Sequence, residues 1–238
     1  MDRSARGEGG GGGFVDDLHA LIDAGRAFGR HPLWLRIAEG RLPRAALGPF
    51  AVQFFLQVRE FPRSVSALHS SCPGYFGADR ARGEPLRGGD RPSSGCNVSH
   101  PELFIRFGES VGVPPDAMMR GVPLPTTAAP IDWFEQSTRK HPFIEGAAAT
   151  NLVAEGRCRV RSVPSRALEQ HYGSTRVQVA FWDVHEQADR EHSVIGDHIV
   201  VRLATTPQLQ ADVRRAVARS LKLRWRFLDG IAAAIDAG

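Results

Sequence analysis

Helical periodicity dominates this chain. Apolar residues recur every three to four positions along most of its length, and almost no segment alternates with a period of two. A half-buried strand needs that alternation, so the chain has little from which to build a sheet. The pattern predicts an all-α fold, a bundle of about seven or eight helices around a central cavity. The segments with helical pattern are 14–28, 33–39, 44–69, 101–112, 127–140, 143–160, 165–172, 175–203 and 206–237.

The chain has the length of one domain. Its 238 residues suffice for a large core but not for two comfortable ones. Residues 1–13 are rich in glycine and are predicted to be disordered. Residues 14–238 are predicted to form the single domain. At about 73–99 the apolar periodicity disappears and Pro, Gly, Arg, Asp and Ser dominate, so a long loop is expected there.

The composition of the chain argues against some classes of binding partner. The chain carries 30 Lys+Arg against 26 Asp+Glu, and these charges are scattered without the basic and aromatic alternation that would bind nucleic acid. No run approaches the roughly 18 apolar residues of a membrane span. Its 3 cysteines are widely spaced and form no Cys-x-x-Cys pair. We therefore expect a cytoplasmic protein that binds neither nucleic acid nor membrane and acts on a small molecule.

Three metal-ligand side chains share one face of a predicted helix near the C-terminus. His185, Asp189 and His192 stand at i, i+4 and i+7, which places them within about 60° around the helix axis. Imidazole and carboxylate together suit iron, zinc or manganese better than calcium or copper(I). Taken alone, such a face also occurs as a polar network without metal.

Other polar residues lie where they would extend this site. Gln53 and Glu60 are seven residues apart on one face of a long, otherwise apolar helix, and Glu155 lies in a predicted helix after a run of small residues. A buried carboxylate is costly unless it is paired or binds metal. Glu60 therefore either binds metal or pairs with an arginine such as Arg59 or Arg63, and Gln53 serves as a weak ligand or as a hydrogen-bonding residue. His100, like the other single histidines, has no partner at ligand spacing and is assigned to a cap or the surface.

Four segments in this order resemble a known family: 57–72, 99–104, 124–127 and the helix around His185. They are similar to the thiaminase II/pyrroloquinoline-quinone synthase superfamily, which has the haem-oxygenase-like fold. The branch they resemble is the haem-oxygenase-like diiron oxidases and oxygenases, the iron-containing redox enzymes. The resemblance covers roughly residues 15 to 235, and its most specific part is Glu155 together with the His185 motif.

The resemblance implies a ligand set and a chemistry. In that branch the first core helix supplies a glutamate and, seven residues later, a histidine, and these positions fall on Gln53 and Glu60 here. The implied metal ligands are Glu60, Glu155, His185, Asp189 and His192, with Gln53 as a weak addition. The implied cofactor is Fe²⁺, two ions, with dioxygen as co-substrate. The implied reaction is the oxidation or oxygenation of a small amine-bearing or amino-acid-like metabolite in a biosynthetic pathway. Relatives commonly pair through helices, so a homodimer is compatible with the resemblance.

Two other functions stay open at this point. A metal-free enzyme of the same superfamily would act on a quinone precursor or a thiamine fragment, with Cys158 as a candidate nucleophile. A catalytically degenerate bundle would act as a binding protein, which the departures at Gln53 and Glu60 would explain.

Overall fold

The computed structural model describes residues 10–24, 28–73, 98–154 and 163–238, without the side chains of residues 28, 154, 163–164 and 185–195. The described elements are helical throughout and include no strand. They are α1 (Gly10–Ala24), α2 (Pro32–Ala38), α3 (Leu47–Ser70), α5 (His100–Ser110), α6 (Pro115–Met119), α7 (Pro125–Arg139), α8 (Phe143–Ala147), the π-helix (Ala148–Ala154), α9 (Val163–Tyr172), α10 (Ala180–Leu203) and α11 (Pro207–Asp236).

The all-α prediction is confirmed, and the differences from it are local. The structure adds the short α6. It divides the described part of the predicted helix 143–160 into α8 and a π-helix, and residues 155–160 lie outside the described residues. Helix α1 begins at Gly10, inside the glycine-rich segment 1–13, and residues 1–9 lie outside the described residues. Most of the predicted loop, residues 74–97, also lies outside them.

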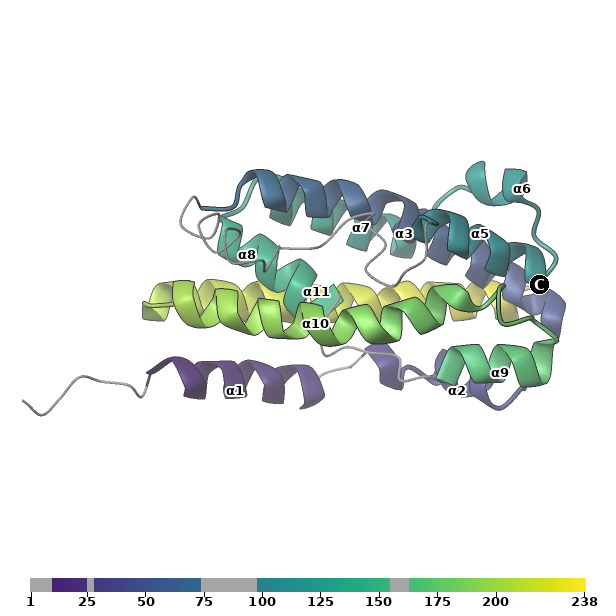
Figure 1. The fold of residues 1–238 in the computed structure, drawn as a ribbon, viewed down its shortest axis with the longest axis horizontal. Helices are drawn as coiled ribbons and strands as arrows, with labels where there is room; N and C mark the ends of the chain where they lie inside the picture. The colour runs from purple at the N-terminus through teal and green to yellow at the C-terminus, as the bar shows by residue number, and fades with distance from the viewer. Residues whose placement is uncertain (1–9, 25–27, 74–97, 155–162) are drawn as a thin grey trace, which may run out of the picture.

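The helices form three layers (Figure 1). Helices α3 and α7 pack along each other in the upper layer, together with α5 and α6. The long helices α10 and α11 run through the middle layer. Helices α1, α2 and α9 cover the other side, where α1 contacts both α10 and α11. The middle of α10 is therefore enclosed from both sides.

Aromatic side chains fill the space between the layers. Phe54 of α3 stacks on Phe104 of α5, with ring centroids 5.3 Å apart. It also contacts Phe181 of α10 at 6.5 Å and Phe227 of α11 at 5.5 Å. Each such pair contributes about 0.5–1.5 kcal/mol beyond the area it buries. One phenylalanine thus ties four helices together.

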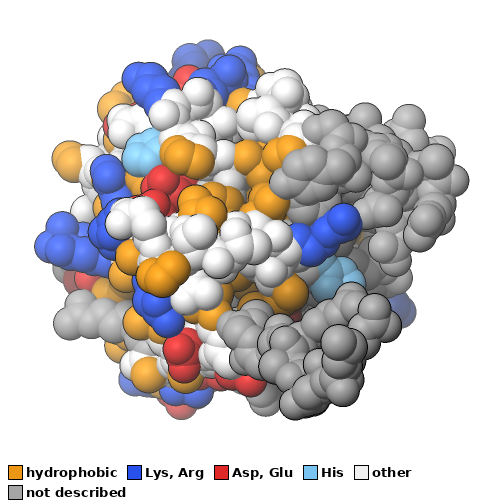
Figure 2. Space-filling model, turned by 90° about the vertical axis from the view of Figure 1, so that its left-hand side faces the viewer, with side chains coloured by type: hydrophobic (Ala, Val, Ile, Leu, Met, Phe, Trp, Pro, Cys, Tyr) orange, Lys and Arg blue, Asp and Glu red, His pale blue; other side chains and the backbone are white. Residues whose placement is uncertain are grey.

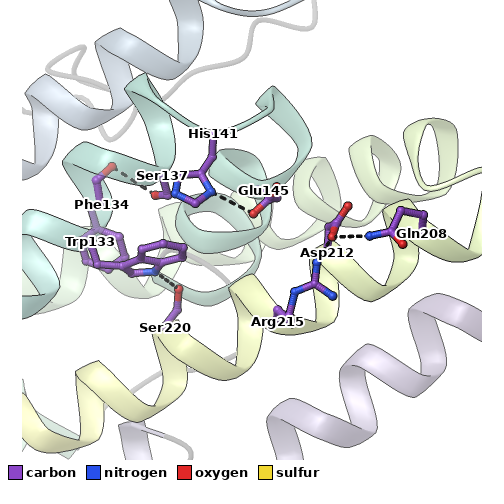
Figure 3. Close-up of polar contacts among 9 residues, drawn as sticks. All are labelled: Trp133, Phe134, Ser137, His141, Glu145, Gln208, Asp212, Arg215 and Ser220. Carbon is purple, nitrogen blue, oxygen red and sulfur yellow. Dashed lines mark hydrogen bonds and ion pairs between the residues drawn. The ribbon is translucent and has the colours of Figure 1, made fainter.

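Polar contacts hold α7 against α11 and α8 (Figure 3). The buried indole N–H of Trp133 donates to Ser220 Oγ at 2.7 Å, which satisfies both groups within the core. His141 Nδ1 lies 3.1 Å from Glu145 Oε2, four residues further along the chain. His141 therefore has a described partner, although the sequence assigned it to a cap or the surface.

Charges of both signs are distributed over the surface. At the end of the bundle seen in Figure 2, lysine and arginine side chains are interspersed with acidic and apolar ones. Among the described helices, none has a stretch apolar and long enough to cross a membrane.

A buried histidine fixes the start of α2. Leu33 N donates to His31 Nδ1 at 3.1 Å, so the ring proton must be on Nε2, which lies 3.1 Å from Asp229 Oδ1 of α11. His31 is 3% exposed. Burial lowers the pKa of His31 below its ordinary 6.5, and the hydrogen bond and charge of Asp229 offset this only in part.

Acidification should therefore destabilise the fold through His31. The unfolded chain takes up a proton near the ordinary pKa, whereas the folded chain resists protonation until the pH is lower. Stability that is present above about pH 6.5 is thus lost as the pH falls toward the folded-state pKa. We expect the urea midpoint of the wild type to fall more between about pH 7.5 and 5.5 than that of His31→Asn, which keeps a cap acceptor but cannot titrate. Equal slopes for both proteins would contradict this assignment.

Candidate metal centre

Helix α10 is continuous from Ala180 to Leu203, so the three predicted ligands 185, 189 and 192 all lie on one α-helix. With position 185 as the origin, positions 189 and 192 lie at about +40° and −20°. The structure describes the backbone of these three residues but not their side chains.

The described residues on either side show which way this face points. Phe181 and Trp182, at about −40° and +60°, are 3% and 9% exposed. Ile199 and Val200, at the same two angles, are each 1% exposed. The opposite side of the helix is exposed at Asp183, His198 and Val201. Positions 185, 189 and 192 therefore lie on the inward face.

Gly196 is the residue through which the inward face of α10 contacts the π-helix. It stands at about +20° on α10, in the centre of the ligand face. A Cβ there would lie 3.1 Å from Leu152 N and 3.2 Å from Asn151 C, which belong to the π-helix. Only a glycine allows the two backbones this approach without displacement. The inward face of α10 is thus packed directly on the π-helix.

The π-helix ends next to the fourth predicted ligand. It runs from Ala148 to Ala154, and Glu155 follows as the next residue of the chain. Short π-helical segments are frequently found at functional sites. Two polar residues inside it are buried: Thr150 Oγ1 donates to Gly146 O at 2.8 Å, and Asn151 is 7% exposed. Glu155 itself lies outside the described residues.

The structure accounts for Gln53 and Glu60 without metal. Gln53 Nε2 donates to Val122 O at 3.0 Å, and its Oε1 accepts from Leu124 N at 2.9 Å. The Glu60 carboxylate accepts from Arg59 at 2.9 Å and from Arg63 at 3.0 Å. Both alternative roles weighed from the sequence, hydrogen bonding for Gln53 and arginine pairing for Glu60, are therefore present.

His100 is a residue that the sequence reasoning set aside. It begins α5, where Ser99 Oγ caps the helix by accepting from Glu102 N at 3.4 Å. The imidazole meets the Phe181 ring edge-on, with centroids 6.3 Å apart. Phe181 lies one turn before position 185 on the inward face of α10. Segment 99–104 carries part of the family resemblance, and this was the sequence signal that could have drawn attention to His100.

The described side chains alone form no complete metal site: no three His, Cys, Asp or Glu side chains among them come together as ligands. Four of the five predicted ligands, Glu155, His185, Asp189 and His192, have side chains outside the described residues. Cys158, the candidate nucleophile of the metal-free alternative, also lies outside them.

The donor set and its placement fit a first-row transition metal. Two histidine positions and one aspartate position share the inward face of α10, and a glutamate follows in the sequence the element that this face packs on. Nitrogen and carboxylate oxygen donors are those that iron takes in non-haem sites.

Comparison with known proteins defines the class. A family model described as iron-containing redox enzyme matches residues 49–225. This chain therefore belongs to the iron-containing redox enzyme family. Its matched part includes the long α3, the π-helix and the ligand face of α10.

Two individual relatives are less than 30% identical to this chain. A 4-aminobenzoate synthase of Nitrosomonas europaea is 29% identical over 224 residues, which cover 92% of this chain and 90% of that protein. A 4-aminobenzoate synthase of Chlamydia trachomatis is 23% identical over 181 residues, 76% of each chain.

Solved structures confirm the haem-oxygenase-like fold. A TenA homologue from Pseudomonas syringae pv. tomato superposes with a TM-score of 0.72 at 16% identity, covering 92% of this chain and 93% of that one. A domain of unknown function with a heme oxygenase-like fold from Shewanella denitrificans gives a TM-score of 0.66 at 14% identity, covering 94% and 90%.

Replacing Gly196 tests whether its contact fixes the ligand face. In Gly196→Ala the new Cβ would press on π-helix backbone, which can yield only by moving away, so we expect a loss of about 1–3 kcal/mol of stability in urea unfolding. The matched control is Gly13→Ala in α1, where a Cβ meets nothing within 4 Å and helix propensity predicts a gain of roughly 0.5–1 kcal/mol. Equal stability of Gly196→Ala and the wild type would refute the tight contact.

Proposed function

We propose that this protein is an iron-dependent oxidoreductase that uses dioxygen to form 4-aminobenzoate or a closely related aromatic amine. The observation that carries the proposal is the inward face of α10. It bears positions 185, 189 and 192 and packs through Gly196 on the element that precedes Glu155. Membership of the iron-containing redox enzyme family and the names of the relatives support the chemistry.

In this proposal each ligand residue has a defined task. His185 and His192 bind through neutral imidazole nitrogens, and the carboxylates of Asp189 and Glu155 offset the positive charge. Iron, when bound, supplies the redox chemistry with dioxygen that side chains alone lack. The apolar residues around α10 exclude water from the reacting groups.

His100 is included in the proposed donor set. Its described contact with Phe181 places an imidazole beside the inward face, one helical turn from position 185. Glu60, in contrast, is already neutralised by Arg59 and Arg63. An imidazole from α5 would supply the nitrogen ligand that the family has on its first core helix and that this chain replaces with Glu60 on α3.

Iron binding tests the face of α10 directly. After anaerobic loading and desalting, we expect about one or more iron ions per wild-type chain, and less than half of the wild-type amount in His185→Ala or Asp189→Ala. His198→Ala and Asp183→Ala are matched controls, because they remove the same groups from the exposed side of the same helix. They should retain wild-type iron.

The same samples test the reaction. Exposure of the loaded wild type to air with cell extract as the substrate source should yield 4-aminobenzoate or a related aromatic amine, detected by mass spectrometry. The proposed function is wrong if iron content is the same in all five proteins or if no aromatic amine depends on iron.

A second pair of variants separates His100 from Glu60. If His100 is a ligand, His100→Ala lowers the iron content by at least about half, since losing a ligand weakens a metal site strongly. Glu60→Gln removes the ion pairs with Arg59 and Arg63, which are partly exposed and contribute little to stability. It should retain the first iron ion. The reverse order of effects would return Glu60 to the site and exclude His100.

A further inference from the structure

Four basic side chains form a straight row along helix α11. With position 215 as the origin, positions 219, 222 and 226 lie at about +40°, −20° and +20° around the helix axis. All four side chains are exposed, and the row extends about 16 Å along the helix. We call this set the basic row, and its members are Arg215, Arg219, Lys222 and Arg226.

Most of these charges have no counter-ion within the described part of the chain. Arg215 pairs with Asp212, which lies one turn earlier on α11 (Figure 3). Arg219, Lys222 and Arg226 form no ion pair with any described carboxylate. Like charges four residues apart weaken a helix, and the row contains two such pairs, 215 with 219 and 222 with 226. The row thus costs the free protein some stability, which binding of an anionic partner would recover.

Arg219 is held in place by an aromatic ring. Its guanidinium carbon lies 4.2 Å from the centroid of the Trp133 ring of α7. That ring is itself fixed, since its N–H donates to Ser220 Oγ at 2.7 Å and His141 meets it edge-on, with centroids 5.4 Å apart (Figure 3). A guanidinium stacked on a ring keeps its in-plane N–H donors available for a carboxylate. Arg219 is therefore a pre-organised carboxylate-binding group within the basic row.

Acidic side chains border the row on both sides. Helix α7 contacts α11 at Ser220, about +140° from position 215, and exposes Asp132. Helix α1 contacts α11 at Arg214, about −100° from position 215, where Arg214 pairs with the exposed Asp17 at 3.1 Å. A wide polyanion such as a nucleic-acid duplex would bring its phosphates against these carboxylates as well as against the row. The surroundings of the row therefore favour a narrow acidic partner.

The row also lacks the apolar groups that a membrane or a single-stranded nucleic acid would use. None of the large apolar side chains that the described residues expose belongs to α11. The Trp133 ring is 3% exposed and carries Arg219 on its face, so a base cannot stack on it. A partner of the row must therefore bind mainly through its own charges.

We propose that the basic row docks an acidic α-helix of a partner protein, with carboxylates at positions i, i+4, i+7 and i+11. On such a helix the carboxylates repeat about every 4.5 or 6 Å along the axis, as the cations of α11 do. In an extended segment the side chains of one face are about 6.6 Å apart, so four of them span roughly 20 Å and lose register with the row. This inference is independent of the proposed function, because it uses no residue of the candidate metal centre.

Two synthetic peptides of equal composition test the proposal. Both are stapled, alanine-rich α-helices of about 16 residues that carry four glutamates. The glutamates lie at i, i+4, i+7 and i+11 in the matched peptide and evenly around the axis in the scrambled one. At about 50 mM salt, fluorescence anisotropy should show the full-length protein binding the matched peptide at least roughly fivefold tighter. Equal binding of the two peptides overturns the proposal.

Charge reversal locates the binding surface. Lys222→Glu and Arg226→Glu should each weaken binding of the matched peptide by roughly tenfold or more, because a like charge then faces each glutamate. Both positions are exposed, so these variants should fold as the wild type does. Arg176→Glu is the matched control, since it makes the same charge change at an exposed turn before α10. An equal loss of binding in this control would indicate attraction to net charge alone and overturn the proposal.

Other polyanions serve as competing ligands. A short DNA duplex and vesicles that contain phosphatidylserine should each bind more weakly than the matched peptide at the same salt concentration. If either binds more tightly, and loses that binding in Lys222→Glu and Arg226→Glu, the row is a nucleic-acid or membrane surface and the proposal is wrong.

Discussion

The contact between Gly196 and the π-helix is the constraint on which the candidate site depends. A Cβ at position 196 would lie 3.1–3.3 Å from backbone atoms of residues 151 and 152, so the two elements touch through main chain. Backbone that cannot retreat fixes the rotation of α10 more firmly than flexible side chains would. Since each residue turns the helix by about 100°, a slip of one position would carry His185, Asp189 and His192 off the inward face. The register of one glycine therefore decides whether three ligand positions face the interior.

The aromatic core extends this constraint toward the other end of α10. Phe181 and Trp182 hold the first turn between α3 and α5, while Ile199 and Val200 are buried in the last turns. The ligand positions lie between two anchored ends, on a helix whose outer side is exposed. Such an arrangement keeps water away from the ligand positions.

Much of the fold followed from the sequence because helical periodicity is a local signal. The bounds of α3, α5, α10 and α11 lie within a few residues of the predicted ones, apart from the start of α10 at Ala180. The π-helix was missed because its small and apolar residues fit an α-helix equally well. The π-helix packs against the backbone of α10 at Gly196, which is a contact with a distant part of the chain. Single-chain patterns carry no information on such a contact.

The sequence predicted some residues of the candidate site and not others, because a local pattern does not reveal contacts between distant segments. The face of α10 could be read from spacing alone. The amide of Gln53, however, is held by backbone about seventy residues away, at Val122 and Leu124, which no local pattern reveals. His100 was set aside because it has no ligand at helical spacing, although ligands of a bundle come from different helices. Its contact with Phe181 became visible only once α5 and α10 were placed together.

The arginine pairing of Glu60 bears on how many metal ions the proposed site would hold. Its side chain is 26% exposed, so the ion pairs with Arg59 and Arg63 are weak and can open. A cation approaching Glu60 would nevertheless meet two guanidinium groups as well as the carboxylate. In the proposed site, Asp189 and Glu155 together balance the charge of one divalent ion. A second ion would depend on a carboxylate that must first leave its arginines. The two binding events are therefore expected to differ in affinity, with the ion held by α10 binding first.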